Sequence, residues 1–520
     1  MRKACSAPWT DVYMSSADNW GSCCCFYLGA QPGAFASDGE VHSLDAVRSS
    51  PQLEELRRFQ AGGPPVDGCG LAYSIDMAPE RNVYFDFTAV EGLTEAQRSN
   101  LDLVRREFEA GTARLTSKPL RASFYFSWGC NLSCGFCYQI PMRDQWKRSL
   151  PDDLFERCRD DFRAMMQVEC IGGEPFAIPS ALAFIRKFVA DPELAAVRLV
   201  LTTNATLLHK HLSWLKAKER ITFSVSIDAV GEAYEALRVG ARWDQVEANM
   251  LAVVEAMRTE RPDWGIVTNA VLTRTGIAGL PEMARFHAEH GIACRFDPLR
   301  LNRGNEELIY REDVVAFPGL LDDIPDWERR VEDAIAILER GGVARPGGEL
   351  GPLLERIRRT AAQPWRIVRP FDGHPAAAIE GAADMSRLMV GAIGPAGSGV
   401  SGEEGGLAGF RSSAMEFGLA ARINCRGGAP GGGTFGVRLL WPVGMGPTDE
   451  TCQTVLYEVQ PFQLVSWREG EQGGRRTVDM VVHALGTEGA DCSLILSLMT
   501  RRPDRFAVLP DGLEIWIADS

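Results

Sequence analysis

The chain contains 520 residues, of which 45% are hydrophobic and 24% charged, and its formal net charge is −14. This length is too great for one hydrophobic core and predicts about three domains. The negative charge argues against nucleic acid as the main partner, because binding a polyanion requires Lys and Arg to neutralise phosphates.

Targeting and redox signals predict a cytoplasmic protein without a membrane partner. No uncharged apolar run approaches the roughly 18 residues of a membrane span. No apolar segment follows the basic residues at positions 2 and 3, so we expect no secretory signal. The chain is also too long to need a framework of disulfides, and we expect its 14 cysteines to be reduced.

Residues 1–90 are predicted to form a small module. Gly, Pro, Asp and Asn interrupt much of this segment, and one helix stands out, with Ser50 as its N-cap and a Gly-Gly-Pro-Pro run at 62–65 as its end. So small a region has little apolar core. A metal cluster would supply the missing cohesion.

Residues 115–300 alternate between strand and helix patterns, which is typical of parallel βαβ units. The predicted strands are 122–127, 167–171, 197–202, 222–227, 266–272 and 293–297. The predicted helices between them are 152–165, 180–190, 210–218, 243–257 and 280–290. Six such repeats predict an α/β fold with a partial (β/α)6 TIM-like barrel, whose chemistry belongs at the C-terminal ends of the strands.

The rest of the chain is predicted to have three parts. Residues 301–390 form a helical extension with an amphipathic stretch at 327–338, and residues 391–409 form a glycine-rich linker. Residues 410–520 contain seven short strands of period two, which predict an antiparallel β-sandwich of jelly-roll type. These strands are 415–423, 435–441, 454–459, 462–467, 478–483, 494–498 and 513–518.

The most informative motif follows the first barrel strand, where Cys130, Cys134 and Cys137 have C-x3-C-x2-C spacing. Three thiolates on one loop can hold three irons of a [4Fe–4S] cluster and leave the fourth iron open. A dithiol redox pair needs two cysteines, and a structural zinc site normally uses four ligands. The spacing therefore favours a cluster with a free coordination position.

With its neighbouring motifs, this segment resembles the radical S-adenosylmethionine (SAM) superfamily over about residues 118–300. Phe136 precedes the last cysteine of the triplet, and Gly172, Gly173 and Glu174 lie in an Ile-Gly-Gly-Glu-Pro sequence after the second strand. A Thr-Asn-Ala-Thr sequence at 203–206 follows the third strand. A Ser-Ile-Asp sequence at 226–228, with Tyr234 and Arg238 beyond it, follows the fourth. These features appear in the order that the family shows.

The resemblance implies two cofactors, a [4Fe–4S] cluster and SAM, which would chelate the open iron and be cleaved to a 5′-deoxyadenosyl radical. Gly172, Gly173 and Glu174 would hold the methionine amino group. Ser226 would bind the ribose or carboxylate, and Arg238 would offset the carboxylate charge. Phe136 would lie against adenine. We left Asn204 out of this set, because Asn favours turn positions in any case.

The N-terminal module has a shorter resemblance, to the SPASM or twitch auxiliary cluster module of radical SAM enzymes. It implies a second [4Fe–4S] cluster held by Cys5, Cys23, Cys24 and Cys69. The chain departs from the family pattern because no C-x2-C pair follows, and Cys25 is an alternative to Cys24. Reduced cysteines or a zinc knot remain alternatives, since tetrathiolate spacing does not choose the metal.

We therefore expect a radical SAM enzyme that abstracts a hydrogen atom from its substrate, with a reductant such as ferredoxin or flavodoxin as partner. The module favours a peptide or protein substrate. A sugar or glycan-linked metabolite is an alternative, because aromatic residues of the last domain could bind saccharides or could form its core. A third reading is a non-enzymatic electron-transfer or sensor protein. No catalytic acid or base is identified, and Asp297 is equally suited to facing the cavity and to capping a turn.

Overall fold

The fold is that of a computed structural model. With short gaps, it describes residues 5–15, 19–22, 44–63, 85–299, 312–345 and 348–361, together with the backbone of ten strands between residues 377 and 517. Within these described parts, no helix combines the length and the apolar character that crossing a membrane requires.

The centre of the molecule is an eight-stranded sheet in the order β2-β1-β3-β4-β5-β6-β7-β8. Seven strands run parallel, and only β2 at the edge is antiparallel to its neighbour. The strands are β1 (Asp11–Ser15), β2 (Asn19–Gly21), β3 (Arg121–Tyr125), β4 (Gln167–Ile171), β5 (Arg198–Thr203), β6 (Ile221–Ser226), β7 (Gly265–Leu272) and β8 (Ala293–Pro298). All six predicted strands are present, and the α/β class with a parallel sheet is confirmed.

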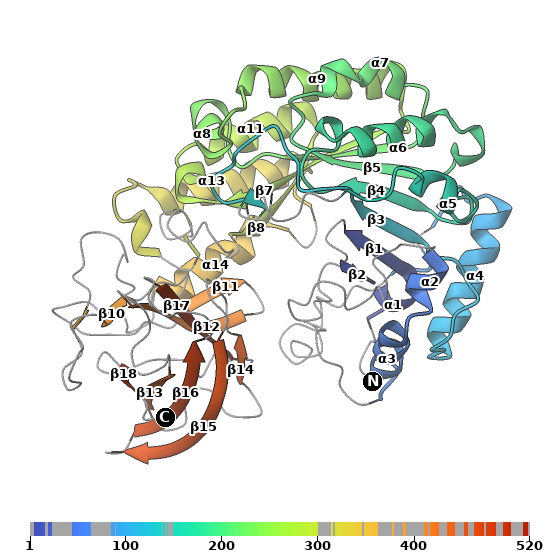
Figure 1. The fold of residues 1–520 in the computed structure, drawn as a ribbon. Helices are drawn as coiled ribbons and strands as arrows, with labels where there is room; N and C mark the ends of the chain where they lie inside the picture. The colour runs from blue at the N-terminus through green and yellow to red at the C-terminus, as the bar shows by residue number, and fades with distance from the viewer. Residues whose placement is uncertain are drawn as a thin grey trace.

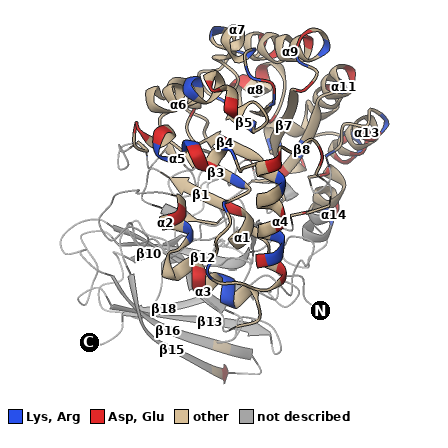
Figure 2. Ribbon diagram, turned by 90° about the vertical axis from the view of Figure 1, so that its right-hand side faces the viewer, with Lys and Arg blue, Asp and Glu red and all other residues tan. Residues whose placement is uncertain are grey.

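One face of this sheet is covered by the helices that connect its strands (Figure 1). They are α5 (Leu154–Phe162), α6 (Pro179–Ala190), α7 (Leu212–Leu215), α8 (Gly231–Leu237), α9 (Trp243–Thr259), α10 (Arg274–Ile277) and α11 (Leu280–His290), with short 3-10 turns η3 (Pro175–Ala177), η4 (Pro192–Leu194) and η5 (Leu208–Lys210). Figure 2 shows both acidic and basic residues on the outer helices. The longer helices α5, α6, α9 and α11 thus turn an apolar stripe to the sheet and their charges outward.

Burial alternates along the strands and gives the sheet two different faces. In β4, Val168 and Cys170 are fully buried under the helices, whereas Glu169 between them is half-buried. The same alternation holds in β3, β6 and β7. The face away from the helices therefore carries side chains that retain contact with solvent, as successive residues of a strand point to opposite sides.

The N-terminal segment joins this sheet, because β1 pairs in parallel with β3. Its helices are α1 (Ala7–Thr10), α2 (Leu44–Arg48) and α3 (Pro51–Gln60), and α4 (Glu95–Glu109) follows. The predicted cap of α3 is confirmed, since Ser50 Oγ accepts a hydrogen bond from the Leu53 amide. We did not predict α4, although Thr94 and Gln97 form a capping box at its start.

Beyond β8, the described elements are a turn η6 (Pro318–Leu321) and two helices, α13 (Trp327–Arg340) and α14 (Leu350–Ala361). Helix α13 packs beside α11 and matches the amphipathic stretch predicted there. The predicted linker lies outside the described residues except for Gly391 at the end of a strand.

The C-terminal part forms two antiparallel sheets. Its strands are β9 (Ala377–Ala378), β10 (Leu388–Gly391), β11 (Phe410–Ser413), β12 (Glu416–Cys425), β13 (Thr434–Pro442), β14 (Cys452–Val455), β15 (Phe462–Gln472), β16 (Arg475–Ala484), β17 (Cys492–Thr500) and β18 (Leu513–Ile517). Strands are found at all seven predicted positions. Strands β9 and β10 fall in the range predicted as helical extension and pair into the sheet of β12. The stacking of the two sheets as a sandwich stays a prediction.

Candidate functional site

The loop that carries the cysteine triplet follows β3 at the C-terminal edge of the parallel sheet. Cys134 is buried, and Cys130 and Cys137 are half-buried. A tight turn brings the second and third cysteines together, because the Cys137 amide donates to the Cys134 carbonyl at 3.0 Å. The loop therefore lies where a β/α barrel places its chemistry.

Three hydrogen-bond donors point at the sulfur atoms of this loop. The Leu132 amide is 3.4 Å from Cys130 Sγ, and Asn204 Nδ2 is 3.7 Å from the same sulfur. A guanidinium nitrogen of Arg238 is 3.9 Å from Cys134 Sγ. Donors of this kind stabilise thiolates and tune the reduction potential of a cluster bound to them.

Burial favours the protonated form of two thiols of the loop, Cys130 and Cys134, when no metal is bound. Burial raises the pKa of Cys134 to about 11, although Arg238 opposes this rise. Burial likewise raises the pKa of Cys130. Metal binding would therefore release protons and would depend on pH.

The two glycines after β4 bring the backbone of that loop against protein atoms. Gly172 and Gly173 have φ values of +87° and +52°. A Cβ on Gly172 would lie 1.9 Å from the ring of Tyr125, and one on Gly173 would lie 1.9 Å from the carbonyl oxygen of Gly129. The Gly173 amide donates to the side chain of Gln139 at 2.9 Å. The glycines thus allow the β4 loop to pack directly on the cysteine loop.

Glu174 is fully buried and binds protein groups through both carboxylate oxygens. One oxygen accepts from Thr203 Oγ1 at 2.8 Å and from the Phe176 amide at 3.2 Å, and the other accepts from the Asn204 amide at 2.7 Å. Burial raises its pKa to about 7, against the effect of these three donors. Its observed contacts join the β4 loop to the β5 loop.

Asn204, which we had left out of the site, has a central position in the structure. Its side chain donates to Asn131 Oδ1 at 3.0 Å and accepts from Thr206 Oγ1 at 2.6 Å, in addition to its contact with Cys130. The next residue, Ala205, has a φ of +61°, which non-glycine residues seldom adopt. The Thr-Asn-Ala-Thr sequence was the signal for this site, but the contact itself depends on the fold.

Arg238 is buried and held by a carboxylate. Its Nε donates to Asp228 Oδ2 at 2.7 Å, while Asp228 Oδ1 accepts from the Val271 amide at 2.8 Å. Burial disfavours the charge, but Asp228 and then Cys134 raise the pKa of Arg238 overall. The guanidinium carbon lies 5.7 Å from the centre of the Phe136 ring, so these two predicted site residues are neighbours.

Polar side chains also line the half-buried face of the sheet, and we did not predict them as site residues. Glu169 accepts from Ser123 and from Thr202, each at 2.8 Å, and so connects β3, β4 and β5. Asn269 donates to Ser224 at 2.6 Å and connects β7 to β6. Their signal in the sequence is a polar residue at alternate positions within otherwise apolar strands.

Two other predicted residues lie at the C-terminal ends of strands. Ser226 is half-buried at the last position of β6. Asp297, near the end of β8, forms an ion pair with Arg295 at 3.0 Å, and both side chains are partly exposed.

Of the cysteines assigned to the auxiliary cluster, only Cys5 is described, and its side chain is buried. Its amide donates to the side chain of Gln60 in α3 at 3.1 Å. Cys23, Cys24, Cys25 and Cys69 lie outside the described residues. The second cluster therefore stays a prediction.

The residues present fit a [4Fe–4S] cluster rather than a single metal ion. Among the described side chains, no three Cys, His, Asp or Glu groups are placed to hold one ion. A cubane cluster separates its protein ligands more widely, because each thiolate binds a different iron. Three thiols on one loop, with N–H donors aimed at two of them, are the kind of donor set that such a cluster uses.

Comparison with known proteins agrees with this site. Residues 124–286 match the model of the radical SAM superfamily. No curated protein matches the chain at a significant level.

Several solved structures are similar to this chain. SuiB from Streptococcus suis bound to S-adenosylmethionine is 21% identical, with a TM-score of 0.32, and the match covers 49% of this chain and 57% of SuiB. SuiB bound to the precursor peptide SuiA gives the same identity and TM-score, with 55% and 63% covered. The protein anSMEcpe with bound AdoMet and Cp18Cys peptide is 18% identical, with a TM-score of 0.27 and 39% and 58% covered.

The chain thus spans about three fifths of the length of these neighbours. The matched residues run from the end of β3 into α11 and include β4 to β7, together with the loops that carry the cysteine triplet and the glycine pair. Residues 124–286 of this chain thus match the radical SAM superfamily model.

Proposed function

We propose that this protein reductively cleaves SAM and abstracts a hydrogen atom from a peptide or protein substrate. The observation that carries the proposal is the convergence on the cysteine loop of donors from two other strand ends, Asn204 after β5 and Arg238 beyond β6. Such an arrangement supports a charged metal cluster at the edge of the sheet, where a substrate on the half-buried face would be within reach.

Cys130, Cys134 and Cys137 would hold the cluster, and the chemistry supplied by cluster and SAM when bound is reductive cleavage to a 5′-deoxyadenosyl radical. The chain's own part is to bind and orient. Peptide carbonyls at Gly172 and Gly173 would accept hydrogen bonds from the methionine amino group. Glu174 would contribute by fixing this loop against the β5 loop, as its contacts with Thr203 and Asn204 suggest.

The other predicted residues have compatible positions. Ser226 has a half-buried hydroxyl at the end of β6, suited to the SAM ribose or carboxylate. Arg238 has a guanidinium whose Nε is held by Asp228 and whose Nη1 points at Cys134, so Nη2 is the nitrogen that would meet the carboxylate. Phe136 is half-buried and offers a ring to adenine beside this guanidinium.

The peptide substrate and the auxiliary cluster rest on the resemblance of the N-terminal segment to a SPASM or twitch module. In that proposal Cys5, Cys23, Cys24 and Cys69 hold the second cluster. A ferredoxin or flavodoxin would supply the electron. The structure adds that the N-terminal segment shares the sheet of the radical SAM domain through β1, so a cluster there would be attached directly to the catalytic unit.

The test is anaerobic reconstitution with iron and sulfide, followed by reduction in the presence of SAM. We expect SAM binding, a change in the EPR signal of the reduced cluster and release of 5′-deoxyadenosine. A variant with Cys130→Ala, Cys134→Ala and Cys137→Ala should release none and should keep only the iron of the N-terminal cluster. Reduction without SAM cleavage would instead support the electron-transfer reading, and an unchanged iron content in the variant would refute both cluster assignments.

A further inference from the structure

A buried charged pair lies directly behind the middle cysteine of the triplet. Asp228 and Arg238 are 2% and 8% exposed, and they are joined by a hydrogen bond of 2.7 Å. Arg238 extends from this pair to within 3.9 Å of Cys134 Sγ. A guanidinium is thereby fixed beside a sulfur atom in a region largely shielded from water.

A second group beside this pair has no partner. Tyr234 precedes Arg238 by one helical turn and is completely buried, yet its hydroxyl makes no hydrogen bond within the described part of the protein. Burial raises the pKa of Tyr234, the charge of Arg238 opposes this rise, and Cys134 and Asp228 add to it. A buried hydroxyl without a partner lowers stability, and a bound group that accepts a hydrogen bond from it would remove that cost.

The charge near Cys134 bears on the reduction of a cluster. Reduction adds one negative charge, and a cation at short distance in a region of low dielectric constant stabilises that added charge. Asp228 acts in the opposite sense, but it bonds Nε of the guanidinium, whereas another nitrogen of Arg238 lies 3.9 Å from Cys134 Sγ. The net effect is therefore that of the cation.

The geometry points to a role for Arg238 and Tyr234 in setting the reduction potential of the cluster at Cys134, with Asp228 as the residue that positions Arg238. In this arrangement Arg238 and the Tyr234 hydroxyl favour the reduced cluster and raise its potential. The inference rests on the cluster proposed above and concerns its electron uptake, which is independent of any contact that Arg238 makes with SAM.

The experiment is a redox titration of the reconstituted full chain, followed by EPR, with SAM omitted throughout. Titanium(III) citrate supplies the single electron, and the signal of this cluster is the one missing from the triple-cysteine variant. We expect Arg238→Gln to shift the one-electron reduction equilibrium at least tenfold toward the oxidised form. This shift corresponds to a reduction potential about 59 mV lower. Tyr234→Phe should shift it in the same direction by a smaller factor.

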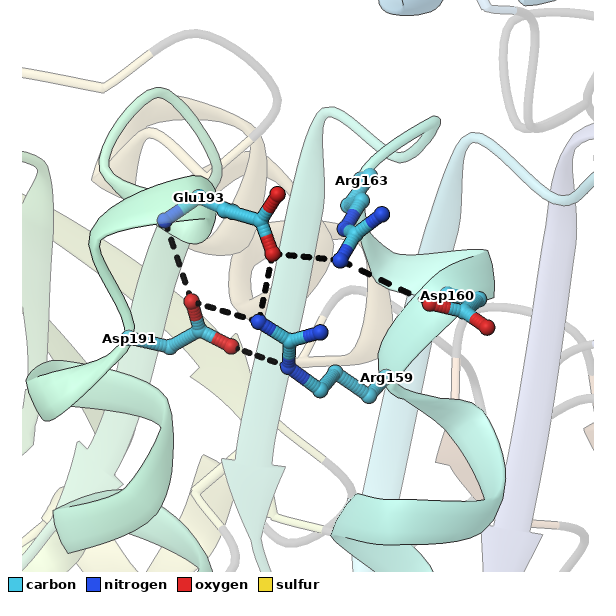
Figure 3. Close-up of polar contacts among 5 residues, drawn as sticks. All are labelled: Arg159, Asp160, Arg163, Asp191 and Glu193. Atoms are coloured by element: carbon cyan, nitrogen blue, oxygen red, sulfur yellow. Dashed lines mark hydrogen bonds and ion pairs between the residues drawn. The ribbon is translucent and has the colours of Figure 1, made fainter.

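Two further variants separate this role from a structural one. Arg238→Lys keeps the positive charge, so its reduction potential should stay close to that of the wild type. A purely steric role for Arg238 would not predict this result. Arg159→Gln is the matched control, because Arg159 also bonds a carboxylate through Nε, at 2.5 Å to Asp191 (Figure 3). This pair joins α5 to η4, ahead of the N-terminal end of β5, and its loss should leave the potential unchanged.

The outcomes distinguish the inference from the proposed function. If wild-type protein binds no cluster at the triplet, the proposed function fails. If Arg238→Gln binds its full iron and keeps the wild-type potential, the proposed function stands and the inference is wrong. If Arg238→Gln loses the cluster, the reduction potential of Tyr234→Phe tests the inference instead, because this variant removes one oxygen atom and leaves the ion pair intact. A wild-type potential in Tyr234→Phe would then show that the inference is wrong.

Discussion

At the scale of single residues, the glycine pair shows how backbone conformation and packing together restrict a position. Gly173 combines a φ of +52° with the close approach of the Gly129 carbonyl. Gly231 has a similar φ of +63°, but no atom lies within 4 Å of the Cβ that an alanine would add. The two positions therefore separate backbone strain from steric overlap.

We predict that Gly173→Ala destabilises the protein more than Gly231→Ala does. The strained φ should lower the free energy of unfolding by about 1–3 kcal/mol in each variant. The overlap with Gly129 should add about 1–3 kcal/mol in Gly173→Ala alone. Urea unfolding measures the difference, and iron content after reconstitution reports whether the cysteine loop is displaced. Equal stability and equal iron content in the two variants would show that the loops do not touch as described.

At the scale of elements, helix α9 supports the loop that carries Asn204. Asn249 in this helix is buried, and its Nδ2 donates to the carbonyl of Ala205 at 2.7 Å and to that of Thr206 at 3.3 Å. Buried carbonyls need such donors, and these two lie in a turn whose backbone has a positive φ. The helix therefore stabilises the conformation that directs Asn204 toward Cys130.

We predict that Asn249→Ala lowers the free energy of unfolding by about 1–3 kcal/mol, because two buried acceptors lose their donor. It should also weaken iron binding, since the Asn204 loop is released. The control is Gln245→Ala one turn earlier in α9, where the side chain is exposed and lies 3.4 Å from the ring of His209. Chemical unfolding and iron analysis of both variants check this. If Asn249→Ala is destabilised but binds iron normally, the conformation of the Asn204 loop does not affect the cluster site.

At the scale of the whole molecule, buried arginines attach the N-terminal segment to the sheet. Arg57 in α3 is fully buried and donates to the carbonyls of Ala113 at 2.6 Å and Pro8 at 3.0 Å. Arg48 donates to the carbonyl of Trp9 at 2.8 Å and also bonds that of Ser117. Burial lowers the pKa of each arginine to about 10, so both remain charged at neutral pH.

We predict that Arg57→Met lowers the free energy of unfolding by about 3 kcal/mol, because several buried carbonyls lose their donor together. Arg58→Met is the matched control on the same helix, since Arg58 is exposed and pairs only with Glu54 at 2.9 Å. Glu54 keeps its second partner, Arg114, in this variant, so the loss of the solvent-exposed Arg58 should cost under about 1 kcal/mol. Limited proteolysis should release the N-terminal segment faster from the first variant than from the second. Equal release would show that other contacts hold the segment.

The sequence by itself determined the order of the six barrel strands and the loops on which the motifs lie. Periodicity and turn signals are local properties, so the positions of β3 to β8 and of helices α9 and α11 could be predicted closely. The spacing of Cys130, Cys134 and Cys137 is also local, and it indicated the metal chemistry. The match of residues 124–286 to the radical SAM superfamily agrees with both.

Only the tertiary structure decided which groups surround those cysteines. Arg238 and Cys134 are 104 positions apart, and Asn204 and Cys130 are 74 apart. The addition of β1 to the sheet likewise pairs Asp11 with Arg121. Contacts at such separations depend on how the strands are ordered and how their loops pack, and no local pattern encodes them. The same reason explains why Glu174 could be assigned to the site from its motif, while its partners on the β5 loop could not.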